Sequence, residues 1–404
     1  MAKRDSKAMV PRLRFPEFRG TKGWEKTPLS TLLDYERPEK YIVTDTAYLE
    51  SGTPVLTANK SFVLGYTNET DGVYSSLPAI IFDDFTTDKK YVDFPFKVKS
   101  SAIKILQTKA DDSLRLIFEL MCGIKFDAKE HKRYYISEYQ NLEIALPERP
   151  EQQKIADCLT LLDEVITAQG RKVEALKAHK RGLMQQLFPR EGETRPRVRF
   201  PEFRNALEWS VTLLGELTLI VRGGSPRPIE EFLTHAKDGL NWLKIGDVDR
   251  EAKYVTKTEE RVRVEALAKT RVIHAGDFIL SNSMSFGRPY ISTIETCIHD
   301  GWIAVTEIPE DLSREFLYYS ILSDKSQRYF ANQAAGGGVQ NLNKDIIKLL
   351  PLEIPPKEEQ QRIAECLSSL DTQITAESHQ LAALKTHKQG LMQQLFPAPP
   401  VASV

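Results

Sequence analysis

The sequence predicts an α+β fold with two α/β bodies and a pair of long coiled-coil helices, arranged as a tandem duplication with pseudo-twofold symmetry. The motif RFPEFR occurs at residues 14–19 and again at 199–204, an offset of 185. The segment EQQKIADCLTLLDEVITAQGRKVEALKAHKRGLMQQLFP at 151–189 closely matches 359–397, an offset of 208. Between these shared ends the two bodies have little sequence in common, and the growth in offset makes the second body 23 residues longer.

The repeat divides the chain into an N-terminal arm, two bodies that each end in a long helix, a linker that repeats the arm, and a tail. The expected ranges are 1–20 (arm), 21–150 (first body), 151–190 (central helix), 191–205 (linker), 206–355 (second body), 356–397 (C-terminal helix) and 398–404 (tail). Short apolar runs such as PAIIF and DFILS, punctuated by Gly, Pro and Asn, indicate mixed α/β bodies. Their strand order does not follow from the sequence.

Composition limits the class of protein. The 404 residues are 41% hydrophobic and 27% charged, which is typical of a soluble globular chain of two or three domains. Neither an apolar run near the roughly 18 residues needed to span a bilayer nor a signal-peptide pattern is found, so we expect a cytoplasmic protein. The four cysteines are far apart and read as reduced thiols. A net charge of −1 means that nucleic-acid binding would need local basic patches or a positively charged partner.

The two repeated helical segments carry an apolar residue every three or four positions for about five heptads, as a coiled-coil helix does. The predicted seam residues are Ile155, Leu159, Leu162, Ile166, Val173, Leu176, Leu183 and Leu187, then Ile363, Leu367, Leu370, Ile374, Leu381, Leu384, Leu391 and Leu395. Polar residues interrupt the stripe at matched places, Gln169 with Glu377 and Lys180 with Lys388, and such interruptions usually fix register. The alternative is that each helix lies along its own body, although a narrow stripe suits a partner helix better.

Two divergent bodies, each followed by a long helix that opens with EQQ-I, resemble the DNA specificity (S) subunit of type I restriction-modification systems. The segments GDFILSNSMSFGRPYI (276–291), AAGGGVQNLNKDIIKLLPLEIPPKEEQQRI (334–363) and NLEIALPERPEQQKI (141–155) support the resemblance. It implies two target-recognition domains separated by a pair of long antiparallel coiled-coil helices. It also implies a non-catalytic reader, in which each domain recognises one half of a bipartite, asymmetric double-stranded DNA site.

The same resemblance implies partners and cofactors outside this chain. Two modification subunits would bind S-adenosylmethionine and methylate adenine at N6, and two restriction subunits would use ATP and Mg²⁺. No GxxxxGK[ST] phosphate loop and no [DN]PP[YF] segment occurs in this sequence, so we expect neither an ATPase nor an aminomethyltransferase here. The cluster FDDFTTDKK imitates a metal-nuclease pattern only weakly. A protein-only adaptor scaffold on a coiled-coil frame remains the alternative, favoured by the near-zero net charge.

DNA contacts require Lys and Arg for phosphates, and Arg, Lys, Asn, Gln, Ser and Thr for base edges. Aligning Tyr91 with Tyr290, an offset of 199, sets one polar loop against another. The candidates in these loops are Thr86, Thr87, Lys89 and Lys90 in the first body and Ser283, Ser285 and Arg288 in the second.

A second pair of segments matches at an offset of 208. KEHKRYY offers a basic strip of Lys129, His131, Lys132, Arg133 and Tyr134, and GGVQNLN offers the amides of Gln340, Asn341 and Asn343. The alternatives are a solvated charge run for the first segment, and a turn with a helix cap for the second. Arg222 and Arg227 are further phosphate candidates.

Overall fold

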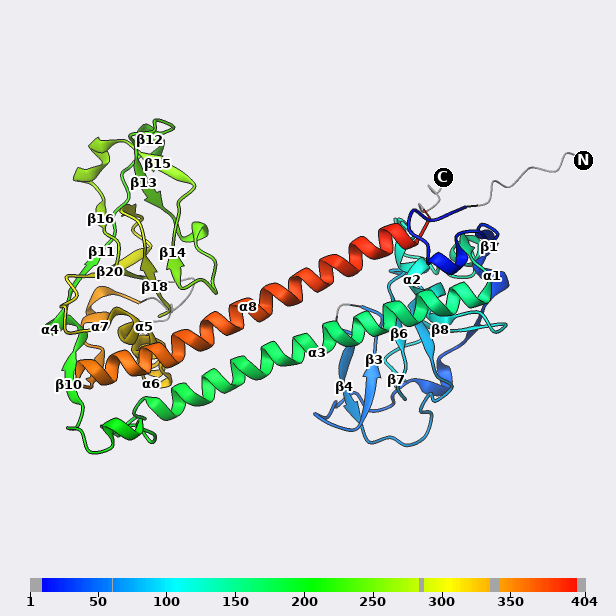
Figure 1. Ribbon diagram of the computed structural model, residues 1–404, viewed down its shortest axis with the longest axis horizontal. Helices are drawn as coiled ribbons and strands as arrows, with labels where there is room; N and C mark the ends of the chain where they lie inside the picture. Colours follow the sequence, from blue (N-terminus) through cyan, green and yellow to red (C-terminus); the bar gives the residue numbers. More distant parts are fainter. Residues whose placement is uncertain (1–8, 60, 283–286, 335–341, 398–404) are drawn as a thin grey trace, which may run out of the picture. The chain divides into compact units, whose positions relative to one another are not determined.

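The computed structural model describes residues 9–59, 61–282, 287–334 and 342–397 (Figure 1). The chain forms two compact units, the first made of 1–170 with 380–404 and the second of 171–379. The boundary passes through two helices of 39 residues, α3 (Arg149–Leu187) and α8 (Lys357–Leu395), so that each unit holds one body and part of each helix. No helix within these described ranges is long and apolar enough to cross a membrane.

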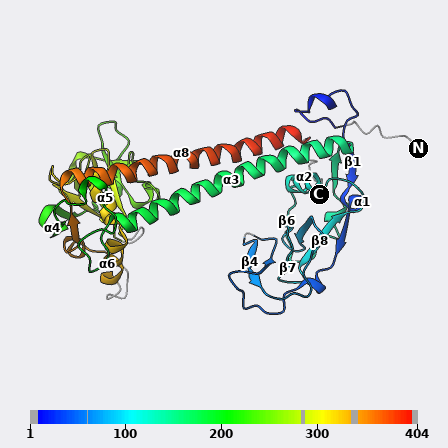
Figure 2. The ribbon, with the colours of Figure 1, turned by 60° about the horizontal axis from the view of Figure 1, so that its bottom comes forward.

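The first body contains two sheets, one in the order β2-β8-β5-β6 and one in the order β4-β3-β7, besides the pair β1-β9 (Figure 2). All strand pairs of the four-stranded sheet are antiparallel, whereas β3 and β7 run parallel. The elements are β1 (Glu25–Pro28), α1 (Leu29–Leu32), β2 (Leu33–Glu36), β3 (Thr53–Leu56), β4 (Val63–Thr67), β5 (Ala79–Asp83), β6 (Lys89–Val92), β7 (Lys97–Val98), β8 (Ile103–Thr108), α2 (Leu114–Gly123) and β9 (Glu143–Leu146).

The second body contains two five-stranded sheets, β11-β20-β17-β18-β14 and β12-β15-β13-β19-β16, besides the pair β10-β21. Its first elements are β10 (Ser210–Leu213), α4 (Leu214–Leu217), β11 (Leu219–Arg222), β12 (Leu233–Thr234), β13 (Leu240–Leu243), β14 (Tyr254–Val255), β15 (Glu260–Val262) and β16 (Arg271–Ile273). They are followed by β17 (Phe278–Ser281), β18 (Pro289–Ser292), β19 (Thr296–Ile298), β20 (Trp302–Thr306), α5 (Arg314–Leu322), α6 (Asp324–Ala334), α7 (Lys344–Lys348) and β21 (Pro351–Ile354).

The two bodies share a topology that their sequences do not reveal. The order β2-β8-β5-β6 in the first body recurs as β11-β20-β17-β18 in the second, and β4-β3-β7 recurs as β15-β13-β19 with the same parallel pair. Strands β5 and β17 are buried at every position. Such strands need apolar character rather than particular side chains, so the fold can persist while the sequence diverges. The second body adds β12, β14 and β16 to this common plan.

The strand register confirms the alignment of the two hairpins at an offset of 199. Ile80 lies opposite Tyr91 between β5 and β6, and Ile279 lies opposite Tyr290 between β17 and β18. Residues 84–88 and 282–288 therefore connect equivalent strands in the two bodies.

A framework of contacts around each body occurs twice at the offsets found in the sequence. The pair β1-β9 joins Glu25 to Leu146, and β10-β21 joins Ser210 to Ile354 in the same relative register. The backbone N–H of Leu29 donates to the carbonyl of Leu142 over 2.9 Å, and the second body repeats this bond between residues 214 and 350.

Each arm contacts the C-terminal end of a long helix within its own unit. The N–H of Leu13 donates to the Gln394 carbonyl of α8 over 2.9 Å, and the N–H of Val198 donates to the Gln186 carbonyl of α3 over 3.0 Å. Behind these contacts, a buried arginine of each arm pairs with the glutamate at the start of the other long helix in its unit. These ion pairs are Arg14 with Glu151 and Arg199 with Glu359.

The predicted apolar stripe of the long helices is confirmed by burial. All sixteen seam residues are buried or half-buried, whereas the position two residues after each of them is mostly exposed. In the first unit, Ile155 and Leu159 share a core with Leu395. In the second unit, Leu187 shares a core with Ile363 and Leu367. Because the numbers rise along α3 as they fall along α8, the helix segments within each unit are antiparallel.

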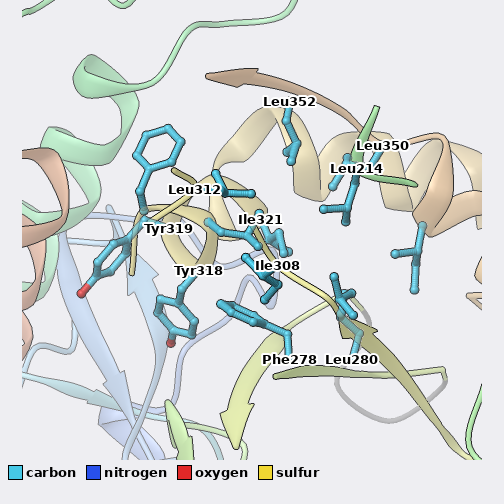
Figure 3. Close-up of a cluster of buried hydrophobic side chains, with 14 of the residues drawn as sticks. Leu214, Phe278, Leu280, Ile308, Leu312, Tyr318, Tyr319, Ile321, Leu350 and Leu352 are labelled. Atoms are coloured by element: carbon cyan, nitrogen blue, oxygen red, sulfur yellow. The ribbon is translucent and has the colours of Figure 1, made fainter. Parts of the chain in front are cut away.

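The alternative prediction, that each long helix lies along its own body, is also correct for the N-terminal part of both helices. Ile155 and Leu159 pack into the core of the first body together with α2, and Ile363 and Leu367 pack into the core of the second body. Figure 3 shows this second core, in which Phe278 of β17 faces Tyr318 of α5. Each long helix therefore begins on its own body.

Candidate nucleic-acid interface

The loop between β5 and β6 is held by two aspartates. A carboxylate oxygen of Asp83 accepts the backbone N–H groups of Phe85 and Thr86, each over 2.9 Å. The N–H of Thr87 donates to the Asp83 carbonyl over 2.9 Å, and Thr87 has a φ of 59°, in the left-handed region. These bonds make a tight turn that leaves Thr86 exposed and buries Thr87.

Asp84 ties the second predicted segment of the first body to this loop. Its backbone carbonyl accepts the N–H of Tyr134, and its carboxylate accepts the N–H of Tyr135, both over 2.8 Å. The carboxylate also lies 3.4 Å from the buried ammonium of Lys104. The structure therefore brings together two segments that the sequence analysis selected independently.

The second body repeats this link. The N–H of Leu342 donates to the Asn282 carbonyl over 2.9 Å. Leu342 is the residue that matches Tyr134 at the offset of 208, and both side chains are 2% exposed. The expectation that Tyr134 faces solvent is therefore wrong, because the position is a core position in both bodies. The Tyr134 hydroxyl donates to the Glu130 carbonyl over 2.7 Å, which closes the segment on itself.

Phe85 forms a platform on the surface of the first body. The His131 ring stacks on the Phe85 ring with centroids 4.8 Å apart and an interplanar angle of 15°. The guanidinium of Arg133 lies 5.8 Å from the same ring centroid. Within the described ranges Arg133 has no carboxylate partner, so its hydrogen-bond donors remain available to a ligand. Phe85 was not among the predicted DNA contacts, although an aromatic residue in an otherwise polar loop was a signal for it.

The lysines of these two segments differ in what they can do. The ammonium of Lys89 points inward, where it donates to the Met121 carbonyl over 3.2 Å, and burial lowers the pKa of Lys89. Lys129 and Lys132 are exposed but lie near acidic side chains, and Lys132 pairs with Glu130 at 3.0 Å and Glu138 at 2.9 Å. Lys90, on β6, is half-buried. The expectation that Lys89 faces outward is therefore wrong, and Thr87 is likewise buried.

Arg288 follows the equivalent loop of the second body. Its guanidinium donates to the Glu251 carbonyl over 3.0 Å and lies 3.9 Å from the Glu251 carboxylate. The side chain is 26% exposed and its Nε is buried without a partner in the described residues. Ser283, Ser285, Gln340 and Asn341 lie outside the described residues.

Arg222 and Arg227 both lie near Asp300, at the edge of the sheet where β11 ends and β20 begins. Arg222 donates to the Asp300 carbonyl over 3.1 Å, and Arg227 lies 3.3 Å from its carboxylate. Burial raises the pKa of Asp300, but the nearby charges of His299 and Arg227 outweigh it and hold this pKa below its ordinary value. Asn282 donates to the Gly301 carbonyl over 3.1 Å, so these arginines lie beside the start of the loop.

Asn343 is a helix cap. Its side-chain oxygen accepts the N–H groups of Asp345 and Ile346, each over 2.9 Å, at the start of α7. The alternative that the sequence analysis left open for this segment, a turn with a helix cap, describes Asn343, and its side-chain oxygen is not available to read a base.

Two of the three aspartates of FDDFTTDKK have structural partners. Asp83 holds the turn and Asp84 pairs with Lys104. No group of three His, Cys, Asp or Glu side chains within the described residues is placed to hold a metal ion.

Comparison with known proteins agrees with this architecture. Residues 207–386 match the family model described as the type I restriction modification DNA specificity domain. The EcoR124I/EcoR124II specificity subunit of Escherichia coli is 32% identical over 374 residues, which cover 86% of this chain and 87% of the relative. The MjaVIII specificity subunit of Methanocaldococcus jannaschii is 23% identical over 386 residues, covering 91% and 88%.

Two solved structures have a similar fold over nearly the whole chain. The S subunit of the type I restriction-modification system of M. genitalium aligns with a TM-score of 0.62 at 15% identity, covering 96% of this chain and 99% of that one. A chain from a study of assembly and conformational transition of the type I R-M system aligns with a TM-score of 0.56 at 17% identity, covering 96% and 100%. Since the Escherichia coli relative is 32% identical over most of both sequences, the chain belongs to the family of type I restriction enzyme specificity subunits.

Proposed function

We propose that this chain reads a bipartite, asymmetric double-stranded DNA site, with one half-site recognised by the body at 21–150 and the other by the body at 206–355. The chain has the DNA sequence-specificity role of its family. The observation that carries the bipartite proposal is the doubled framework, in which matched arms, strand pairs and buried ion pairs surround each body. A framework repeated around two bodies with different surface loops suits two readers of different sequence.

The partners follow from the same doubling. Two matched sets of arm and helix surfaces can bind two copies of one partner in equivalent ways. We assign these places to two modification subunits that use S-adenosylmethionine to methylate adenine at N6. Two restriction subunits that use ATP and Mg²⁺ would complete the complex, and this chain would be its non-catalytic subunit, acting in the cytoplasm.

We further propose that α3 and α8 form an antiparallel coiled-coil spacer between the two recognition domains. The continuous helices of 39 residues and the periodic burial of their seams support this role. The length of the helices would then set the unread gap between the half-sites.

Within the first body, the side chains best suited to DNA are Thr86 of the hairpin loop with His131 and Arg133 beside Phe85. Arginine can donate two hydrogen bonds to a guanine edge or bind a phosphate, and an aromatic platform fixes its orientation. In the second body, Arg222, Arg227 and Arg288 lie around the corresponding loop. Each of these three arginines would exchange an internal contact for a DNA contact on binding.

An exchange of bodies tests the proposal. The junctions should lie between the paired framework residues, after Leu29 and before Leu142, so that β1, β9 and the ion pair of Arg14 with Glu151 are kept. The chimeric chain is purified with its modification subunits, and the methylated sites are mapped. We expect one half-site to change and the other half-site and the gap to stay the same. The matched control exchanges the second body between 214 and 350 and should change only the other half.

If either exchange alters both halves, the two-reader proposal is wrong. The protein-only scaffold makes a different prediction for the same complexes. A DNA reader loses affinity by decades as salt rises when it neutralises several phosphates, whereas a scaffold that never contacts DNA leaves this salt dependence to its partners. The family membership does not favour the scaffold.

A further inference from the structure

A lysine and an aspartate join α3 to α8 at one place in each unit. In the first unit the ammonium of Lys388 lies 2.8 Å from the carboxylate of Asp163, and in the second unit Lys180 lies 2.6 Å from Asp371. The pairs match at the offset of 208, and their exposures match too, with 19% and 18% for the lysine side chains and 32% and 31% for the aspartates. The sequence drew attention to these lysines only as interruptions of the apolar stripe.

In the first unit the pair continues into the body through α2. Arg115 donates to the second carboxylate oxygen of Asp163, and Glu119, one turn further along α2, lies 3.5 Å from the ammonium of Lys388. Arg115 also pairs with Glu119. Four charges of alternating sign therefore close a ring between the two long helices and α2.

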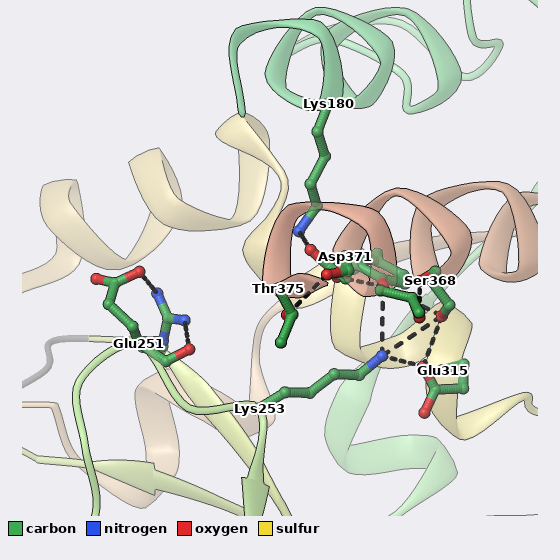
Figure 4. Close-up of polar contacts among 10 residues, drawn as sticks. Lys180, Glu251, Lys253, Glu315, Ser368, Asp371 and Thr375 are labelled. Carbon is green, nitrogen blue, oxygen red and sulfur yellow. Dashed lines mark hydrogen bonds and ion pairs between the residues drawn. The ribbon is translucent and has the colours of Figure 1, made fainter. Parts of the chain in front are cut away.

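In the second unit the corresponding residues of α5 lie at the offset of 200, but their chemistry differs. The hydroxyl of Tyr319 donates to Asp371 over 2.6 Å, and the ammonium of Lys180 lies 5.1 Å from the Tyr319 ring centroid. Glu315 accepts a hydrogen bond from Ser368 of α8 over 3.0 Å and pairs with Lys253 (Figure 4). The ammonium of Lys253 also lies 3.3 Å from the Tyr319 hydroxyl.

Helix α2 connects this ring to the candidate DNA loop. Its Met121 carbonyl accepts both the ammonium of Lys89, at the start of β6, and the hydroxyl of Tyr139 over 3.3 Å. Strand β6 directly follows the loop 84–88. In the second unit, α5 contacts β18, which directly follows the equivalent loop. A rotation of α2 or α5 on the helix pair would therefore move the loop.

We propose that Asp163 and Asp371 are positioning residues, each of which holds a recognition body at a fixed angle on the helix pair by bonding to one helix of that body, α2 in the first and α5 in the second. This inference rests on the proposed function, because it assigns the angle a role in selecting the gap between half-sites. The lysine and the aspartate supplied by the long helices are the same in both units. The groups supplied by the bodies are Arg115 with Glu119 in one and Glu315 with Tyr319 in the other.

The consequence is a compatibility rule for bodies. A body is held correctly only if the helix equivalent to α2 or α5 offers groups that complement the shared Lys–Asp pair. The two solutions in this chain show that the complement can be an ion pair or a tyrosine hydroxyl supported by a lysine.

Exchanging the charges distinguishes two roles for the Lys–Asp pair: holding the body at a fixed angle, or only setting the register of α3 against α8. The helix-exchanged variant carries Asp163→Lys and Lys388→Asp, which restores an ion pair between α3 and α8. It also places the new lysine against Arg115 and the new aspartate against Glu119. The fully exchanged variant adds Arg115→Glu and Glu119→Lys, so that every contact in the ring is again between opposite charges.

The first measurement is methylation by the complete complex on a set of DNA sites whose gap is varied one base pair at a time. We expect the helix-exchanged variant to raise methylation at gaps one base pair from the preferred value by roughly tenfold relative to the preferred gap, because residues of one network are strongly coupled. The fully exchanged variant should return within about twofold of the unmodified chain. Lys177→Ala is the matched control, since among the described residues Lys177 forms only an exposed ion pair with Glu174 of the same helix.

The second measurement is hydrogen exchange of the α2 amides, which does not depend on DNA reading. Exchange should be faster in the helix-exchanged variant and normal in the fully exchanged one. If the helix-exchanged variant already behaves as the unmodified chain in both measurements, the pair sets helix register only and the inference is wrong. Failure of the fully exchanged variant to restore α2 also overturns it.

The uncharged variants Asp163→Asn and Tyr319→Phe provide a milder test that does not depend on folding of the exchanged chains. Each should broaden the accepted gap without changing either half-site. An unchanged gap distribution in both overturns the inference. If the unmodified complex shows no bipartite methylation, the proposed function fails instead, and the α2 exchange data alone decide whether the body is held in this way.

Discussion

Replacing Glu151 with Gln should destabilise the first unit by about 3–5 kcal/mol, because it removes one partner of a buried ion pair. The side chains of Arg14 and Glu151 are only 5% and 2% exposed. The Arg14 Nε lies 2.7 Å from a Glu151 oxygen, and the other end of the guanidinium donates to the carbonyls of Thr21 and Lys22 over 3.1 and 2.8 Å. Glutamine keeps the shape but leaves the guanidinium buried without a counter-charge.

The hydrogen bond to Glu151 raises the pKa of Arg14, although burial opposes this. Even without Glu151 an arginine does not lose its proton in a protein, so the guanidinium cannot escape the penalty by deprotonation. The assay is urea unfolding of the purified chain, followed by tryptophan fluorescence, since the Trp24 indole lies 3.4 Å from Glu151. The double variant Arg14→Met with Glu151→Gln should cost at least about 2 kcal/mol less than the sum of the two single changes.

The second unit has an equivalent ion pair, in which the same change can be tested. Arg199 and Glu359 are 7% and 1% exposed in the same geometry, so Glu359→Gln should cost about as much in the second unit. If the free energy of unfolding falls by less than about 1 kcal/mol in both glutamine variants, the pairs are solvated in solution. The conclusion that buried ion pairs hold the arms on the long helices would then be wrong.

Further predictions concern the cap, an acidic group, the candidate surface and the spacer. Asn343→Ala should cost about 1 kcal/mol of stability through loss of the α7 cap and leave base discrimination unchanged, as unfolding and methylation mapping would show. Burial raises the pKa of Glu315, but hydrogen bonds from Lys253 and Tyr254 outweigh it and hold the pKa below its ordinary value. The stability that this carboxylate contributes is therefore present at pH values above the ordinary pKa of a glutamate and lost as pH falls through the folded pKa. The stability difference between the unmodified chain and Glu315→Gln should therefore shrink in acid unfolding curves; a constant difference would contradict this. Arg133→Ala should weaken DNA binding by about 1–3 kcal/mol with relaxed discrimination at one base pair if Arg133 reads a base, and uniformly with a shallower salt slope if it contacts a phosphate; no effect would remove it from the interface. Matched four-residue insertions after Gln169 and Glu377 add about 6 Å to both helices and should lengthen the preferred gap by one or two base pairs, and an unchanged gap would exclude the spacer role.

The shared arms and long helices were predictable from the sequence because the chain repeats both of them. A heptad stripe predicts which face of a helix is buried, and the burial of the sixteen seam residues follows that prediction. The pairing of Arg14 with Glu151 was not predictable, since the two residues are 137 positions apart and each motif alone gives no partner. Their matched recurrence at 199 and 359 is a signal that could have suggested the contact.

The common topology of the bodies could not be predicted, for a physical reason. Fully buried strands such as β5 and β17 lack the alternation of polar and apolar residues that identifies a half-exposed strand. Only the hairpin containing Tyr91 and Tyr290 kept enough sequence to be aligned, and there the predicted offset is confirmed by the register.

Among candidate DNA contacts, position along the chain was a better guide than residue type. The two segments chosen in the first body do lie together. The ammonium of Lys89, however, donates to a carbonyl of α2, and Tyr134 lies in the core. Residue type gave no warning, because a lysine stem can be buried while its ammonium bonds to a helix end. The matching Leu342 was the available signal that Tyr134 occupies a core position.

The cations around the candidate surfaces are largely paired with acids, which affects how this chain can discriminate between DNA sequences. Lys132 has two glutamate partners, Arg227 has Asp300, and Arg288 has Glu251. If such a cation is to contact DNA it must first leave a carboxylate, so the exchange of one ion pair for another gains little free energy. At a poorly matched DNA site, the cation loses its internal ion pair without gaining a full set of DNA contacts in return. Selectivity can arise in this way without high affinity, in keeping with a net charge of −1, and leaves most of the affinity to be supplied by the partner subunits.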